Sequence, residues 1–132
     1  MKILFMCVAN SARSQMAEGL AKKLLGTNVK IQSAGSKATK VNPLAVQAMA
    51  EIGIDISGQT SKAVEFIDPV SVDTVITLCA EEVCPVFLGK AKKLNWPFPD
   101  PTGSGSDEEQ LKRFRDVRDK IKEKLLLLKS EI

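Results

Sequence analysis

Short runs of apolar residues alternate along the chain with segments in which apolar residues recur every three or four positions. The β-favouring runs predict strands over 2–8, 29–33, 72–78 and 92–96. The helical spacing predicts helices over 14–25, over 43–52 and from 107 onward, with a short helical turn over 61–66. Strands that alternate with helices are typical of parallel sheets built by right-handed crossovers. We therefore expect an α/β fold: a single three-layer domain, 1–132, with a four-stranded parallel sheet and helices on both faces.

Local signals support the helices. Asn42 and Pro43 form an N-cap followed by a proline in the first turn, and Gly26 and Gly53 end the first two helices. In the last helix the apolar positions trace one face; they are Leu111, Phe114, Val117, Ile121, Leu125 and Leu128. This face is predicted to pack on the sheet.

Composition limits the classes of function. The 132 residues carry 19 Lys and Arg against 16 Asp and Glu, a net charge of +3, which does not by itself indicate nucleic acid or an anionic membrane as partner. No segment reaches the roughly 20 apolar residues of a transmembrane helix, and the first apolar run is too short for a signal peptide. Three cysteines do not form the disulfide framework of a secreted domain. We expect a soluble, cytoplasmic monomer with reduced thiols.

The sequence has no histidine and no tyrosine. This excludes Ser-His-Asp triads, Cys-His pairs and every histidine-ligated metal site. Any chemistry must therefore use cysteine, carboxylate, arginine, hydroxyl or backbone groups.

Candidate residues lie where the predicted strands end. Cys7, Ser33 and Cys79 end the first three strands, and Asp100 follows the fourth. Sites in open parallel sheets form at the carboxyl ends of the strands. Two thiols and a carboxylate from distant parts of the chain are thus predicted to meet at one edge.

The segment CVANSARS, residues 7–14, lies between a strand and a helix, so its backbone N–H groups can surround an anion at a helix N-terminus. Arg13 can bind two oxygens of a tetrahedral oxyanion, and the Ser11 or Ser14 hydroxyl can stabilise a Cys7 thiolate. The predicted oxyanion-binding residues are Val8, Ala9, Asn10, Ser11, Ala12, Arg13 and Ser14. Alternatively, Cys7 is a small buried apolar residue and Arg13 is solvated.

This loop resembles the CX5R(S) phosphate loop of the low-molecular-weight protein tyrosine phosphatase fold. The whole chain is similar to the thioredoxin-coupled arsenate reductases built on that fold. The matching motifs are NSARSQMAEG, SAG, NPLAVQAM, EIGIDISGQTS, VITLC, a following CP, the DP at Asp100 and FRDVRDKI.

The resemblance implies a reaction. Cys7 would attack arsenate, held by Arg13 and the loop amides, and Asp100 would protonate the departing oxygen. Cys79 would then attack the Cys7 sulfur and release arsenite, and Cys84 would take over the disulfide for reduction by thioredoxin. Phosphate and sulfate would compete with arsenate, and no cofactor would be bound. Read alone, Asp100 could be a turn residue before proline, and the last two cysteines could be core residues or part of an incomplete zinc site.

The chain departs from the family pattern at three places. Ala12 stands where many members carry an additional cysteine outside the relay. The spacing from Cys79 to Cys84 is shorter than in the best-known members. Lys62 stands where potassium-binding members have an aspartate, although Asn10, Glu18 and Ser33 match that site. A Lys62 ammonium in the cation's place would give weak or no potassium dependence; otherwise Lys62 is simply solvated. No other metal is expected.

The cysteine spacing has a geometric consequence. In a helix, Cys79 and Cys84 would have Cα atoms ~8.6 Å apart, whereas a disulfide generally needs less than ~7 Å. We therefore expect oxidation to be coupled to local melting of residues 79–90.

Two other functions fit the same residues. A phosphomonoester hydrolase of the phosphatase type would use Cys7, Arg13 and Asp100 alone, but Thr102, Gly103 and Ser104 offer little to hold a phenyl ring. A noncatalytic oxyanion-binding redox sensor would use the thiols without turnover, and the presence of Asp100 disfavours it.

Overall fold

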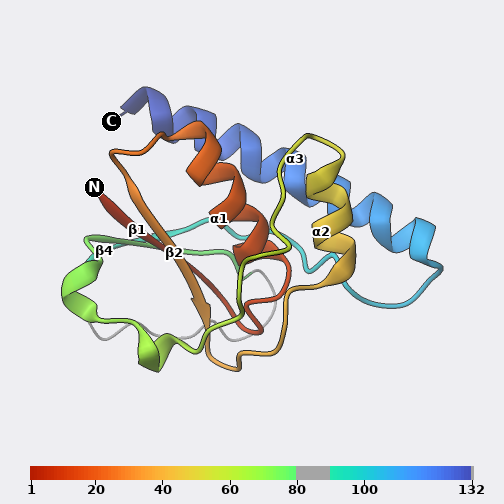
Figure 1. The fold of residues 1–132 in the computed structure, drawn as a ribbon, viewed down its shortest axis with the longest axis horizontal. Helices are drawn as coiled ribbons and strands as arrows, with labels where there is room; N and C mark the ends of the chain where they lie inside the picture. Colours follow the sequence, from red (N-terminus) through yellow and green to blue (C-terminus); the bar gives the residue numbers. More distant parts are fainter. Residues whose placement is uncertain (80–89, 132) are drawn as a thin grey trace.

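The computed structural model describes residues 1–79 and 90–131. The elements in chain order are β1 (Lys2–Cys7), α1 (Arg13–Leu24), β2 (Lys30–Gly35), α2 (Pro43–Ala50), the 3-10 helices η1 (Val64–Phe66) and η2 (Pro69–Ser71), β3 (Thr74–Thr77), β4 (Lys92–Asn95) and α3 (Asp107–Glu131). The strands form one parallel sheet in the order β2-β1-β3-β4 (Figure 1). The predicted fold class is confirmed.

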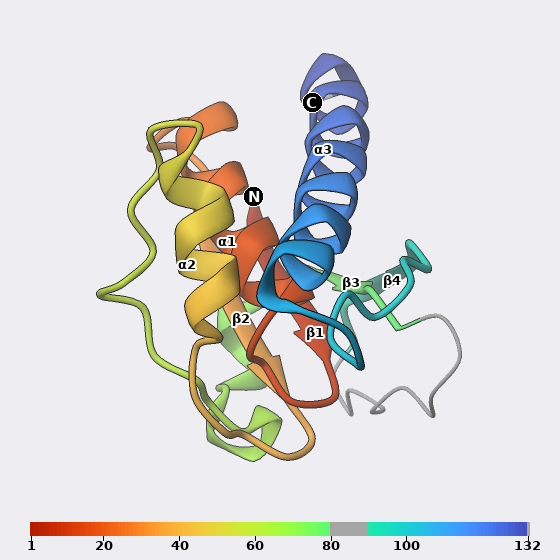
Figure 2. The ribbon, with the colours of Figure 1, turned by 90° about the vertical axis from the view of Figure 1, so that its right-hand side faces the viewer.

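The sheet separates two apolar clusters. Figure 2 shows the three α-helices on one side of the sheet and the segment with η1 and η2 on the other. Alternate residues of β1 point to opposite sides: Ile3 and Phe5 join the cluster under the α-helices, and Leu4 and Met6 join the cluster formed with the 3-10 segment. All four side chains are fully buried. The uninterrupted apolar run of β1 therefore reflects a strand covered on both faces.

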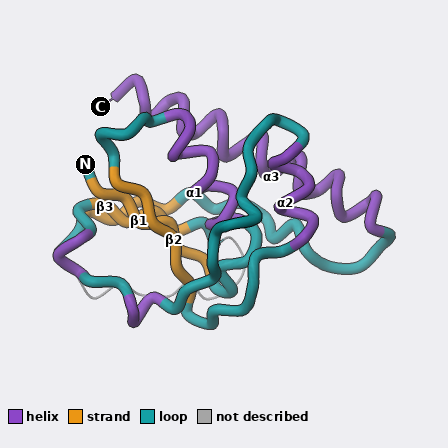
Figure 3. The backbone as a smooth tube through the Cα atoms, viewed as in Figure 1, coloured by secondary structure: helices purple, strands orange, loops and turns teal. Residues whose placement is uncertain are grey.

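The three α-helices also pack on one another, as the purple helices of Figure 3 show. The predicted apolar face of α3 is buried along its length. Beside it, Glu51 at the end of α2 binds Arg115 at 2.6 Å and Arg118 at 3.0 Å. The Arg115 guanidinium holds the pKa of Glu51 below its usual value.

The bounds of most elements differ from expectation by one to three residues, and two differences have a clear physical cause. β2 runs to Gly35 rather than Ser33, because its pairing with β1 continues to the register Cys7↔Gly35. The helical segment after residue 60 contains a second turn, η2, that was not expected; Asp68 caps it and Pro69 begins it, the same signal that starts α2 at Asn42. In the described part of the chain, no helix has the length and apolar character needed to cross a membrane.

Candidate active site

Neighbouring segments hold the loop between β1 and α1 by hydrogen bonds to its backbone carbonyl groups. The donors come from residues 37–42 and from Ser61. The bonds are Lys37 N to Val8 O at 2.9 Å, Thr39 N and Ser61 Oγ to Ala9 O at 3.3 and 3.1 Å, and Asn42 N to Ser11 O at 2.9 Å. Three carbonyl groups of the loop are thus anchored by hydrogen bonds to segments outside it.

The orientation of these carbonyls determines where the N–H groups point. The peptide bonds are trans, so each N–H lies opposite the carbonyl of the preceding residue. Carbonyls that bond outward therefore turn the N–H groups of Ala9, Asn10 and Ala12 toward the interior of the loop. Asn10 N–H donates to the Cys7 sulfur at 3.2 Å. Inward N–H groups at the start of a helix form an anion-binding nest.

Helix α1 leaves its first turn available to such an anion. Its N-cap residue, Ala12, has no side-chain cap hydrogen bond. The N-terminal N–H groups of a helix need partners and carry partial positive charge. An oxyanion beside Cys7 would satisfy both conditions.

Cys7 is a free thiol, 3% exposed, at the centre of this nest. Its sulfur lies 2.9 Å from Ser14 Oγ, and Ser14 Oγ accepts from Asn10 Nδ2 at 2.8 Å. A hydroxyl that accepts from an amide has its own proton available for the sulfur. This orientation directs a hydroxyl donor at the sulfur, which as a thiolate would be the nucleophilic form of cysteine. No histidine is needed for this arrangement.

Asn10 has a left-handed backbone conformation, φ 49°, and is fully buried. This conformation is costly for residues other than glycine, although asparagine tolerates it better than most. Its Oδ1 accepts from Lys62 N at 2.7 Å. The bend that turns the loop N–H groups inward is therefore held by the side chain of the same residue.

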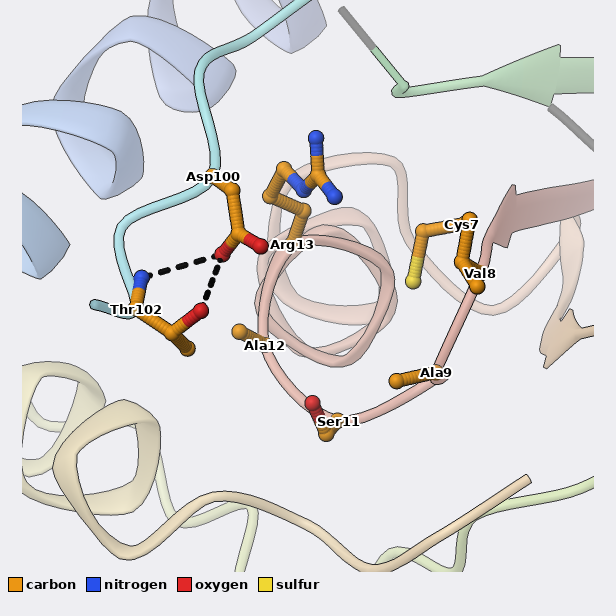
Figure 4. Close-up of a pocket in the computed structure, with 8 residues that line it drawn as sticks. All are labelled: Cys7, Val8, Ala9, Ser11, Ala12, Arg13, Asp100 and Thr102. Carbon is orange, nitrogen blue, oxygen red and sulfur yellow. Dashed lines mark hydrogen bonds between the residues drawn. The ribbon is translucent and has the colours of Figure 1, made fainter. Parts of the chain in front are cut away.

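Arg13, 5% exposed, lies at the N-terminus of α1. Its guanidinium donates to Phe98 O at 2.9 Å and to Leu78 O at 3.3 Å. These contacts direct it toward the end of β3 and the loop after β4, and Figure 4 shows the guanidinium turned away from the curve of the loop. Arg13 thus links the nest to the chain segment that leads into Cys79.

A pocket of about 180 Å³ opens over the loop. Its lining residues are Cys7, Val8, Ala9, Ser11, Ala12, Arg13, Asp100 and Thr102. Asp100 faces Cys7 across this pocket (Figure 4). Its Oδ1 accepts from Thr102 N at 2.9 Å and Thr102 Oγ1 at 2.7 Å, which holds the carboxyl in place. Asp100 therefore forms the turn considered above and also lines the pocket.

Cys79 follows the end of β3 and is 3% exposed. The preceding residue, Leu78, donates its N–H to Met6 O at 2.9 Å. The ends of β1 and β3, where Cys7 and Cys79 lie, are therefore neighbours. Cys79 is disulfide-bonded, whereas Cys7 is free. Cys84 lies outside the described residues, and so do residues 80–89 of the segment expected to melt on oxidation.

Of the predicted cation-site positions, Glu18 and Ser33 contact each other, whereas Asn10 binds the backbone N–H of Lys62. Glu18, 4% exposed, is hydrogen-bonded to Ser33 Oγ, and its Oε2 lies 2.6 Å from Lys22 Nζ. Lys62 instead places its ammonium on Thr60 O at 3.2 Å. The lysine that neutralises Glu18 is therefore Lys22, one helical turn away, a spacing that the sequence itself displays.

Several residues that shape the site were not predicted. Gly35 packs against the loop backbone, and Thr39 and Ser61 hydrogen-bond Ala9 O. Gln15 and Gln59 support Asn10 from behind. Gly35, Thr39, Ser61 and Gln59 carry no local signal of such a role, because each acts on a segment distant in the sequence. Gln15 lies only five residues after Asn10, but its amide is oriented by the distant Gln59.

Comparison with known protein families and structures gives relatives of this chain. The family model described as low molecular weight phosphotyrosine protein phosphatase matches residues 2–132.

The chain belongs to this family.

Among the relatives in this phosphatase family, the arsenate reductase of Halalkalibacterium halodurans is 49% identical over 122 residues, which are 90% of this chain and 88% of the relative. A solved arsenate reductase in the phosphate binding state has a TM-score of 0.82 and 39% identity, and the match covers 99% of this chain and 98% of that one. A thioredoxin-dependent arsenate reductase from Corynebacterium glutamicum has a TM-score of 0.64 and 30% identity, covering 96% of this chain and 62% of that one. The chain is thus similar to the arsenate reductases of the family.

Proposed function

We propose that this protein reduces arsenate to arsenite, with Cys7 as nucleophile, Cys79 and then Cys84 as resolving thiols, and thioredoxin as the reductant. The observation that carries the proposal is the free Cys7 thiol in a loop whose N–H groups face inward, at the strand end next to a disulfide-bonded Cys79. The similarity to arsenate reductases, one of them thioredoxin-dependent, supports the substrate and the reductant.

The first step is covalent. The Cys7 thiolate attacks arsenic(V) and forms an S–As bond, while one arsenate oxygen leaves as water. Asp100, on the same pocket, supplies the proton to that oxygen. The inward N–H groups and Arg13 balance the negative charge of the oxyanion, for which Arg13 exchanges its carbonyl partners for arsenate oxygens.

The second step transfers electrons. The Cys79 thiolate attacks the Cys7 sulfur, a Cys7–Cys79 disulfide forms, and the electron pair of the broken S–As bond stays on arsenic, which leaves as arsenite. The Cys84 thiolate then attacks the Cys79 sulfur and releases Cys7 as a thiolate. A dithiol of thioredoxin reduces the resulting disulfide. A protein with Cys79 bonded and Cys7 free has the bonding pattern expected after this exchange.

A coupled assay tests the proposal. Reduced protein is incubated with arsenate, thioredoxin, thioredoxin reductase and NADPH. We expect steady NADPH oxidation in the parent and, in Cys84→Ser, no more than about one arsenite per protein, because the Cys7–Cys79 disulfide has no resolving thiol.

Hydrolysis of p-nitrophenyl phosphate by the same two proteins, the parent and Cys84→Ser, distinguishes a reductase from a phosphatase. Hydrolysis that survives Cys84→Ser, with no arsenate turnover in the parent, would instead establish a phosphatase. Phosphate binding with neither activity would establish an oxyanion-binding redox sensor. Slow hydrolysis beside arsenate turnover agrees with the proposal, since the nest accepts tetrahedral oxyanions of similar size.

We also propose that the reaction needs no potassium ion. The residues that match a potassium site do not offer free ligands: Glu18 is bound by Ser33 and Lys22, and Asn10 Oδ1 accepts from Lys62 N. Within residues 1–79 and 90–131, no group of three or more Cys, Asp or Glu side chains could hold a metal ion.

Lys22→Met tests whether the Lys22 ammonium serves as the cation for Glu18 in place of a potassium ion. The variant keeps most of the aliphatic stem but leaves the buried Glu18 carboxylate without its cation, which we expect to lower the free energy of unfolding by roughly 1–2 kcal/mol. Thermal unfolding in KCl and in choline chloride is the measurement. The loss should be smaller in KCl, while arsenate turnover of the parent should agree within about twofold in the two salts. A parent activity that rises severalfold with KCl would contradict the proposal.

A further inference from the structure

Behind the nest lies a side chain that the reaction does not use. Gln15, in the first turn of α1, is fully buried. Its Nε2 lies 3.0 Å from each of three acceptors: Asn10 O, Asn10 Oδ1 and Thr60 O. One amide group thus contacts both the main chain and the side chain of the residue with the left-handed conformation.

The orientation of this amide is unambiguous. Two of its partners, Asn10 O and Thr60 O, are backbone carbonyls that can only accept, so the nitrogen must face them. The oxygen then faces Gln59, whose Nε2 donates to Gln15 Oε1 at 2.7 Å and to Gln15 O at 3.1 Å. Gln59, half-buried in the segment after α2, therefore fixes the Gln15 amide from the far side.

Hydrogen-bond partners also fix the orientation of the Asn10 amide and the Ser14 hydroxyl, which lie between Gln15 and the Cys7 sulfur. Asn10 Oδ1 accepts from Gln15 and from the Lys62 backbone N–H, so Asn10 Nδ2 must point to Ser14 Oγ. Ser14 then has its proton available for Cys7 Sγ. Each donor is oriented by the one before it, and the chain of hydrogen bonds runs Gln59, Gln15, Asn10, Ser14, Cys7.

We propose that Gln15, braced by Gln59, is a positioning residue for the nucleophile: it holds Asn10 in its left-handed conformation and so directs the Asn10 N–H and the Ser14 hydroxyl at the Cys7 sulfur. Removing the Gln15 amide removes a donor from α1 to Asn10 O and Oδ1, and a strained residue relaxes when its surroundings no longer determine it. Loss of the bend would move the Asn10 N–H and the Ser14 hydroxyl away from the Cys7 sulfur and would open the oxyanion nest. The role assumes Cys7 as the reacting thiol of the proposed function.

Gln15→Met is the test, because methionine has a similar length and no amide. Two properties are measured on the protein with Cys79 in its disulfide: the dissociation constant for inorganic phosphate, by calorimetry, and the rate of iodoacetamide alkylation of Cys7 near neutral pH, by mass spectrometry of the Cys7 peptide. We expect phosphate to bind roughly five- to tenfold more weakly and alkylation to slow by a similar factor.

Gln32→Met is the matched control. Gln32 is partly buried and, like Gln15, uses its amide Nε2 as donor, to Ser71 O and Ser71 Oγ, but it lies on β2 and away from the loop. A merely structural effect would lower the melting temperature in both variants, whereas only Gln15→Met should change phosphate binding and alkylation. Gln59→Met, at a less buried position, should give the same changes in smaller degree and provides the readout where Gln15→Met fails to fold.

The proposal is wrong where the folded Gln15→Met and Gln59→Met variants bind phosphate and react with iodoacetamide within about twofold of the parent, or where Gln32→Met changes both properties equally. Neither measurement requires arsenate turnover. A protein that lacks reductase activity but shows the expected changes would refute the proposed function and leave this inference standing.

Discussion

Cys7→Ser is expected to abolish arsenate reduction, lowering its rate by at least about 10⁴-fold, while the variant folds and binds phosphate at least as tightly as the parent. Reduction needs an electron pair from sulfur, and an oxygen at this position cannot enter a disulfide. The serine hydroxyl would also stay protonated, because the chain has no histidine to act as its base. Removing a thiolate beside the anion removes a repulsion, so binding should not weaken.

Arsenite formation in a single turnover, phosphate affinity and thermal unfolding are the measurements. Cys79→Ser is the matched control, since it is also a change from a 3%-exposed cysteine to serine. It should lose arsenite formation but keep any aryl phosphate hydrolysis shown by the parent, which Cys7→Ser should lose. Arsenite release by Cys7→Ser would refute the assignment of the nucleophile.

Gly35→Ala is expected to disrupt the oxyanion loop from outside the pocket. A Cβ at Gly35 would overlap Val8 O and lie 2.8 Å from Cys7 O and 2.9 Å from Asn10 N. All three are backbone atoms of the nest, so no side chain can rotate away and the loop itself must move. A displacement of about 1 Å at a reacting centre costs roughly 100-fold in rate. We expect a loss of about that size in arsenate turnover, and about 1–3 kcal/mol in the free energy of unfolding.

Gly58→Ala supplies the control, because a Cβ there meets nothing within 4 Å. It should leave turnover and phosphate affinity unchanged and leave stability equal or slightly increased. Phosphate calorimetry and denaturant unfolding of the two variants separate a loop effect from a general cost of adding a methyl group. Normal phosphate binding by Gly35→Ala would show that the loop does not depend on this close approach.

The sequence was most informative where the signal is local. The apolar run of β1, the apolar face of α3 and the cap at Asn42 all depend on neighbours in the chain, and each matches the structure. The spacing of Glu18 and Lys22 is equally local, and it would have identified the cation partner that was instead expected at Lys62. In the structure the Lys62 ammonium instead lies on Thr60 O.

Boundaries were less predictable where pairing decides them. Ala34 and Gly35 have weak intrinsic preference for strands, yet they extend β2 because Met6 and Cys7 of β1 lie beside them in register. The extension brings Gly35 under the loop, which makes a small residue necessary there.

By itself the amino-acid sequence predicted the class of fold and singled out Cys7 as the proposed nucleophile together with the loop that follows it, because Cys7, the residues to Ser14 and the start of α1 are continuous in the chain. Only the tertiary structure decided how that loop is held. Its carbonyls bond to residues 37–42 and to Ser61, Arg13 reaches Leu78 and Phe98, and Gln59 orients Gln15. Such bonds join segments dozens of residues apart, and they depend on the order of strands in the sheet, which no local pattern of side chains encodes.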